Sequence, residues 1–146
     1  MITSEVNVSE LKELAGRMLT LQEADSLLRE ISTTMLAITR ERIHEAGLNA
    51  NGSSIGEYSD RYLKLRESNN LGTDRQVRLF FTGQMQNDYT VVDISDTEYG
   101  LGFQNQLNAD KADWSEDRFG KIYALTSSEL DQVSAIVAEF VANTLK

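Results

Sequence analysis

Apolar residues recur every three or four positions over one long stretch of the chain, and this period constrains the fold more than any other feature of the sequence. On a helix these residues share one face, whereas on a strand they would alternate between two faces. Thr20 and Glu23 form a capping box before the stretch, and Gly47 suits a helix end. We therefore predict a helix over about residues 20–46, with an apolar face of Leu21, Ala24, Leu27, Leu28, Ile31, Met35, Ile38 and Ile43.

A second pattern, in the middle of the chain, predicts a helical turn and a hairpin. Residues 79–81 are bulky and apolar, Thr82 suits a helix cap, and residues 89–94 are rich in β-branched and aromatic side chains. The turn-like residues 96–98 precede residues 99–103, in which large side chains alternate with glycine. We expect two antiparallel strands here.

The C-terminal third predicts two further helices. Asn108 suits the cap of a helix over residues 109–119 that ends at Gly120, and residues 121–125 fit either a last strand or an extended lead-in. Thr126 and Glu129 form a capping box, in which the threonine hydroxyl accepts from the Glu129 amide and the carboxylate reaches back. The final helix then has an apolar face of Leu130, Val133, Ile136, Val137, Phe140, Val141 and Leu145.

These elements fit one domain, residues 1–146, of the α+β class. We expect a long helix and a C-terminal helix packed on a small, mainly antiparallel sheet. A short N-terminal helix is predicted within residues 1–19, at about residues 8–18, and residues 47–78 form a long central loop. The chain has no cysteine, no leader pattern and no apolar run near the ~20 residues of a membrane span. We therefore expect a soluble protein with no membrane partner.

The central loop carries the first set of candidate contact residues. Ser59 suits the cap of a short helix, and residues 48–78 hold five bases against four acids, whereas the chain as a whole has a net charge of −9. One interpretation is a solvated surface loop. The other is a basic arm that meets the acidic surface of another copy head to tail. The candidate contact residues of this arm are Tyr58, Arg61, Tyr62, Lys64 and Arg66.

Trp114 is the only tryptophan, and Arg118 and Phe119 follow it at helical spacing. Large aromatic residues and arginine are enriched at the energetic centres of interfaces, although a tryptophan is more often a partly buried packing residue. We predict that Trp114 and Arg118 contact another copy or a neighbouring ring.

The sequence contains few of the residues that a catalytic, metal or cofactor site needs. The single histidine, His44, lies three residues after Glu41, but a carboxylate-bridged metal site needs a second such motif on a facing helix. We expect His44 to be a surface or interface residue near a helix end. Gly100 and Gly102 lack the third glycine of a nucleotide-binding loop. We predict no catalytic residues, no metal and no cofactors.

The order of three motifs resembles a known family. "LFFTGQMQNDYTVVDI", "YGLGF" and "RFGKIYALTSSEL" precede the final helix in the order found in phage virion-morphogenesis and tail-completion proteins of the neck. In that family the central loop carries a glycine, an aromatic residue, a hydroxyl residue, then a tyrosine and a base. In this chain they correspond to Gly56, Tyr58, Ser59, Tyr62, Lys64 and Arg66, with Tyr58 where many relatives have tryptophan.

The resemblance implies a structural, non-enzymatic virion protein of the head-tail connector. It would form a homo-oligomeric ring, expected to be hexameric, that joins or seals the tail, with neighbouring connector and tail proteins as partners. It would be found in the neck of the virion, and in the host cytoplasm during assembly. The acidic charge disfavours nucleic-acid binding, so DNA would pass through the lumen without sequence-specific contact. The alternatives are a tail-terminator ring, or a small acidic enzyme or regulator.

Overall fold

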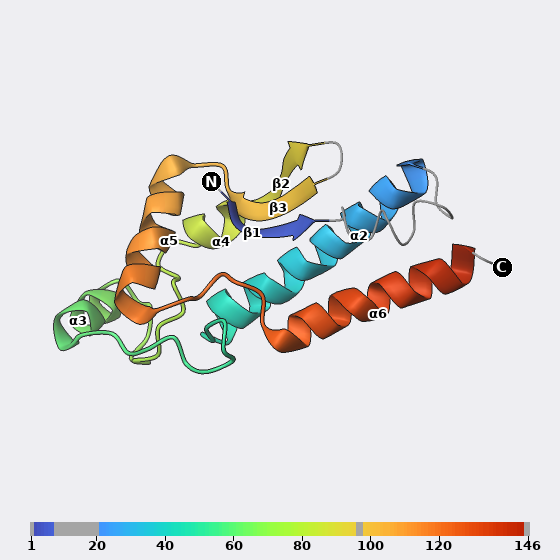
Figure 1. Ribbon diagram of the computed structural model, residues 1–146. Helices are drawn as coiled ribbons and strands as arrows, with labels where there is room; N and C mark the ends of the chain where they lie inside the picture. The colour runs from blue at the N-terminus through green and yellow to red at the C-terminus, as the bar shows by residue number, and fades with distance from the viewer. Residues whose placement is uncertain (1, 8–20, 96–97, 145–146) are drawn as a thin grey trace.

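The computed structural model describes residues 2–7, 21–95 and 98–144 (Figure 1). Its elements follow in the order β1 (Ile2–Asn7), α2 (Leu21–Arg40), the π-helical turn η1 (Glu41–Glu45), α3 (Asp60–Ser68), α4 (Gln84–Asp88), β2 (Tyr89–Ser95), β3 (Glu98–Phe103), α5 (Gln106–Phe119) and α6 (Ser127–Thr144). The expected α+β class is confirmed.

The described strands form one antiparallel sheet in the order β1-β3-β2. The predicted β2–β3 hairpin is present, with Val91 opposite Leu101. The sequence did not predict β1, which pairs with the other edge of β3 and places Glu5 opposite Gly100. The helix expected near residues 8–18 lies outside the described residues.

The sheet and the two long helices lie in three layers (Figure 1). The sheet lies against α2, and α6 packs along the side of α2 that faces away from the sheet. The C-terminal helix therefore packs chiefly on the long helix rather than directly on the sheet. The core between the layers contains Leu28, Ile31 and Met35 from α2, Leu101 and Phe103 from β3, and the rings of Tyr89 and Tyr123. Most of the apolar face that the sequence predicted is therefore buried here.

The long helix ends just before Gly47, the residue that the sequence predicted as its stop. After Arg40 the helix widens into η1, and Gly47 then has a φ of +68°, a left-handed value that suits glycine. A Cβ atom on Gly47 would lie 2.6 Å from the carbonyl oxygen of Val77. The backbone at Gly47, just after the helix, therefore packs directly against the backbone of the central loop at Val77.

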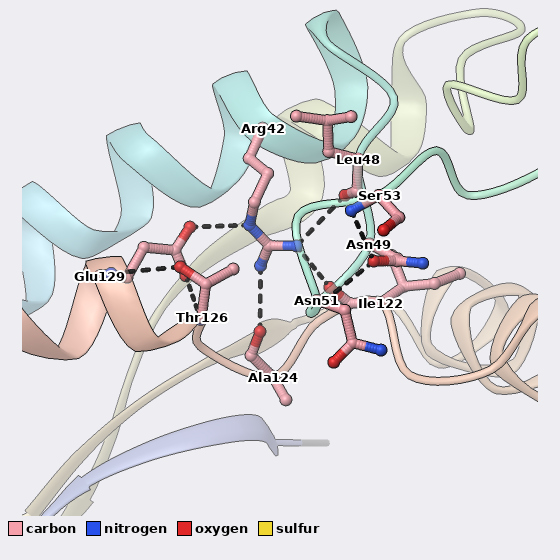
Figure 2. A network of polar contacts seen from close by, with 9 residues as sticks. All are labelled: Arg42, Leu48, Asn49, Asn51, Ser53, Ile122, Ala124, Thr126 and Glu129. Atoms are coloured by element: carbon pink, nitrogen blue, oxygen red, sulfur yellow. Dashed lines mark hydrogen bonds and ion pairs between the residues drawn. The ribbon is translucent and has the colours of Figure 1, made fainter.

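A buried arginine joins η1 to the start of α6 (Figure 2). Arg42 Nε donates to Glu129 Oε1 at 2.7 Å, and both side chains are almost fully buried. Glu129 Oε2 accepts from the Thr126 amide at 2.8 Å, and Thr126 Oγ1 accepts from the Glu129 amide at 3.1 Å, so the predicted capping box is confirmed. The two terminal nitrogens of Arg42 donate to the backbone carbonyls of three residues: Leu48, Ile122 and Ala124.

Two local predictions were wrong, and for a third the structure selects one of two alternatives. The cap of α5 is Asn105, whose side chain accepts from the Leu107 amide, whereas Asn108 is buried inside the helix and donates to Asp88. For residues 121–125, which the sequence left as a last strand or a lead-in, the structure shows the lead-in to α6 and no strand. His44 is buried instead of exposed, because the π-helical turn directs residues 42–44 inward.

Candidate interaction site, an aromatic cleft

The central loop folds back on itself instead of extending into solvent. Glu57 and Gln76 form an isolated antiparallel bridge, and the amide of Tyr58 donates to the Arg75 carbonyl at 2.8 Å. Ser59 caps α3 as predicted, with its hydroxyl accepting from the Tyr62 amide. The two halves of the loop therefore hold α3 in a fixed place.

Aromatic rings cluster where α3 meets residues 79–83. The ring centroids of Tyr58 and Tyr62 are 5.1 Å apart, and those of Tyr62 and Phe81 are 6.4 Å apart. The Arg66 guanidinium lies 4.5 Å from the Tyr58 ring centroid, and it also donates to the Phe80 carbonyl. Arg66 is only 7% exposed, so it packs under the Tyr58 ring as part of the cluster and is not available to a partner.

The cluster forms one wall of a cleft with a volume of about 590 Å³, which we call the aromatic cleft. Its walls are α3, residues 79–85 and α5, and it is lined by Tyr58, Tyr62, Leu65, Phe80, Phe81, Trp114 and Phe119 among others. Trp114 is 61% exposed, and Leu65 is 49% exposed. A concave, mostly apolar surface of this kind marks a binding site more often than a bare surface does.

Helix α5 divides its charges between two faces. Lys111, Trp114 and Arg118 lie on the face that lines the cleft, at spacings of three and four residues. Asp110, Asp113 and Asp117 do not line it. The only acidic residue in the lining is Glu57, so the cleft is locally basic although the chain is acidic.

The structure brings together four of the seven predicted contact residues. Tyr58, Tyr62, Trp114 and Arg118 all line the aromatic cleft. Arg61 and Lys64 are exposed on α3 but do not line it, and Arg66 is buried beneath Tyr58. Sequence reasoning missed Phe80 and Phe81, because an apolar run before a strand indicates core residues, and it missed Lys111, a single base in an acidic helix.

His44 is buried and does not line the aromatic cleft. Burial lowers its pKa to about 4, the nearby backbone of Leu79 and Arg78 acts in the opposite direction, and the charge of Arg40 lowers it further. His44 is therefore neutral at physiological pH. No cluster of three or more metal-ligating side chains is found among residues 2–7, 21–95 and 98–144.

Comparison with family models, with curated proteins and with solved structures gives no match. Within the described part of the chain, no helix has the length and apolar character needed to cross a membrane.

Proposed function

We propose that this protein is a structural component of a phage virion, acting in the head-tail connector or neck as a tail-completion protein. The aromatic cleft is the observation that carries the proposal. It offers an exposed tryptophan among tyrosines and a flanking arginine, the residue types that dominate binding energy at protein interfaces. The order of the three motifs that resembles tail-completion proteins supplies the setting.

The proposed mechanism is assembly through complementary surfaces. Copies of the chain form a closed ring, expected to be hexameric, that joins or seals the tail for head attachment and contacts neighbouring connector and tail proteins. The acidic charge of the chain suits a lumen through which DNA moves, because like charges keep the phosphate backbone from adhering. The protein would be assembled in the host cytoplasm and retained in the virion.

A catalytic role for the cleft is less well supported. Among the residues that line it, Glu57 is the only carboxylate, and there is no histidine. General acid–base catalysis usually places two titratable groups within reach of one substrate. The cleft therefore suits binding better than it suits chemistry. The nearest alternative is a tail-terminator ring. Such a ring would sit at a different place in the virion but would assemble in the same way.

The proposal is tested by counting copies per particle. Quantitative peptide mass spectrometry on purified virions from the source of the sequence should give a small, fixed number that fits one closed ring. Virions assembled with Trp114→Ala should lack the protein or fail to join heads to tails, whereas Arg75→Ala, a change outside the cleft, should not alter the count. Absence of the wild-type protein from intact virions would reject the virion role.

A further inference from the structure

The two bases that line the aromatic cleft are unpaired within the described part of the chain. Lys111 and Arg118 come from α5, and neither forms an ion pair with a residue that the structure describes. Arg118 instead lies over the Phe119 ring, with its guanidinium carbon 5.1 Å from the ring centroid. Unpaired cations beside apolar surface are complementary to a ligand that brings its own carboxylates. The cleft therefore favours an occupant that is both apolar and acidic.

The cleft-facing residues of α5 have the spacing of a helix contact. Lys111, Trp114 and Arg118 stand at positions i, i+3 and i+7, so they share one face, and the two bases are about 10 Å apart along the helix. Leu107, 51% exposed, lies four residues before Lys111 and continues this face. The whole face is about 16 Å long, with the indole between the bases.

A partner helix matches this arrangement better than a partner strand does. On a helix, residues i and i+7 lie on one face about 10 Å apart, with i+3 and i+4 between them. A strand turns every second residue to one side, which gives spacings of about 7 or 13 Å. Carboxylates at i and i+7 would therefore meet the two bases, while apolar side chains at i+3 and i+4 pack on Trp114.

The described part of the chain does not present such a helix to a second copy. Seven large apolar side chains are exposed there, and five of them line the cleft: Tyr62, Leu65, Phe80, Phe81 and Trp114. Leu107 extends the cleft, so only Leu130 on α6 remains. Acids that bracket Leu130 in this pattern would stand at the positions of Thr126, Ser127, Val133 and Ser134. None of these residues is acidic, and the occupant is therefore expected on another protein.

We propose that the aromatic cleft binds an amphipathic helix of a neighbouring protein, in which two carboxylates bracket a pair of large apolar side chains. The apolar pair packs on the indole of Trp114, and the carboxylates pair with Lys111 and Arg118. The inference rests on the proposed connector function, and it gives the chemistry of the partner that the cleft receives.

Trp114 reports directly on the occupant, because it is the only tryptophan in the chain and is 61% exposed. The probe is a synthetic helical peptide without tryptophan that has Glu at i and i+7 and Leu at i+3 and i+4. Its titration should shift the Trp114 emission to shorter wavelength, since the indole leaves water. Two matched peptides, one with Lys for both Glu and one with Ala for both Leu, should bind at least about tenfold more weakly. No shift with up to about 1 mM of the probe, or equal affinity for all three peptides, would overturn the inference.

Charge reversal shows whether the two bases select the peptide. Lys111→Glu with Arg118→Glu should reverse the preference, so that the Lys peptide binds more tightly than the Glu peptide. Arg61→Glu with Lys64→Glu changes the net charge equally at exposed positions outside the cleft, and it should keep the wild-type preference. Circular dichroism checks that both variants fold like wild type. An unchanged preference in the cleft variant, or a reversed one in the α3 variant, would contradict the contact.

The partner helix and the virion role can fail independently. A protein found in virions at a ring-like copy number, but without the peptide preference, would keep the virion role and lose the partner helix. The peptide preference in a protein absent from virions would keep the helix contact and reject the virion role.

Discussion

At the scale of single residues, Arg42 is the side chain whose loss we expect to cost most. Arg42→Met would leave the Glu129 carboxylate buried without its ion pair, and three backbone carbonyls would lose a donor. We predict a fall of about 3–5 kcal/mol in the free energy of unfolding. Arg75→Met removes an exposed pair with Asp60 and should cost far less, because water screens an exposed ion pair. Urea denaturation of both variants measures the difference, and equal losses would contradict the role of the network.

His44 makes a prediction about pH. The unfolded histidine takes up its proton near pH 6.5, and the folded one near pH 4, so the unfolded state binds more protons between these values. Stability supplied by the neutral ring is complete above about pH 6.5 and is lost as the pH falls toward 4. We expect this group to make the protein about 2 kcal/mol less stable at pH 5 than at pH 7.5.

The comparison with His44→Gln isolates this contribution from that of the carboxylates. The variant should be less stable than wild type at pH 7.5, but its stability should change less between pH 7.5 and pH 5. Denaturant unfolding at the two pH values gives both differences. Parallel pH profiles for the two proteins would mean that the His44 pKa is close to its ordinary value.

At the scale of elements, the end of the long helix depends on a close backbone contact. Gly47→Ala would place a methyl group 2.6 Å from the Val77 carbonyl oxygen, at a residue with positive φ. Gly52→Ala is a matched control, because Gly52 has a φ of +79° and no atom within 4 Å of the added group. We predict losses of about 1 kcal/mol for Gly52→Ala and at least about 2–3 kcal/mol for Gly47→Ala. Thermal unfolding of the two variants should separate strain from steric overlap, and equal losses would leave strain as the only effect.

Elements with a local signal could be predicted from the sequence, and elements that depend on distant partners could not. The Thr126 capping box and the β2–β3 hairpin are specified by residues a few positions apart, and both are present. In contrast, β1 is polar and exists as a strand through its pairing with β3, nearly a hundred residues away. The cap of α5 was misplaced by three residues, because two asparagines flank its start and tertiary contact with Asp88 selects Asn108 for burial.

For the candidate site too, the residue types could be predicted from the sequence, but their arrangement in space could not. The aromatic and basic residue types at Tyr58, Tyr62, Trp114 and Arg118 predicted contact residues, but they gave no sign that the four share one cleft. Phe80 and Phe81 have the composition of core residues, but each of them is 37% exposed, and Phe81 contacts Tyr62 of α3. Conversely, Arg66 looked like a surface base, but it lies beneath Tyr58.

At the scale of the whole molecule, the net charge of −9 determines how the protein meets DNA. We predict that a fluorescently labelled duplex shows no anisotropy change at about 150 mM salt, with a dissociation constant weaker than the roughly 100 μM limit of ordinary non-specific binding. The reason is that an acidic chain repels the phosphate backbone and offers few cations to replace the counterions of DNA. The variant Asp113→Lys, Asp117→Lys and Asp131→Lys makes the surface less acidic and should bind more tightly, with an affinity that falls as salt rises. Micromolar binding by the wild-type protein would instead indicate that DNA is a bound partner. It would contradict the proposal that DNA passes through the ring without adhering.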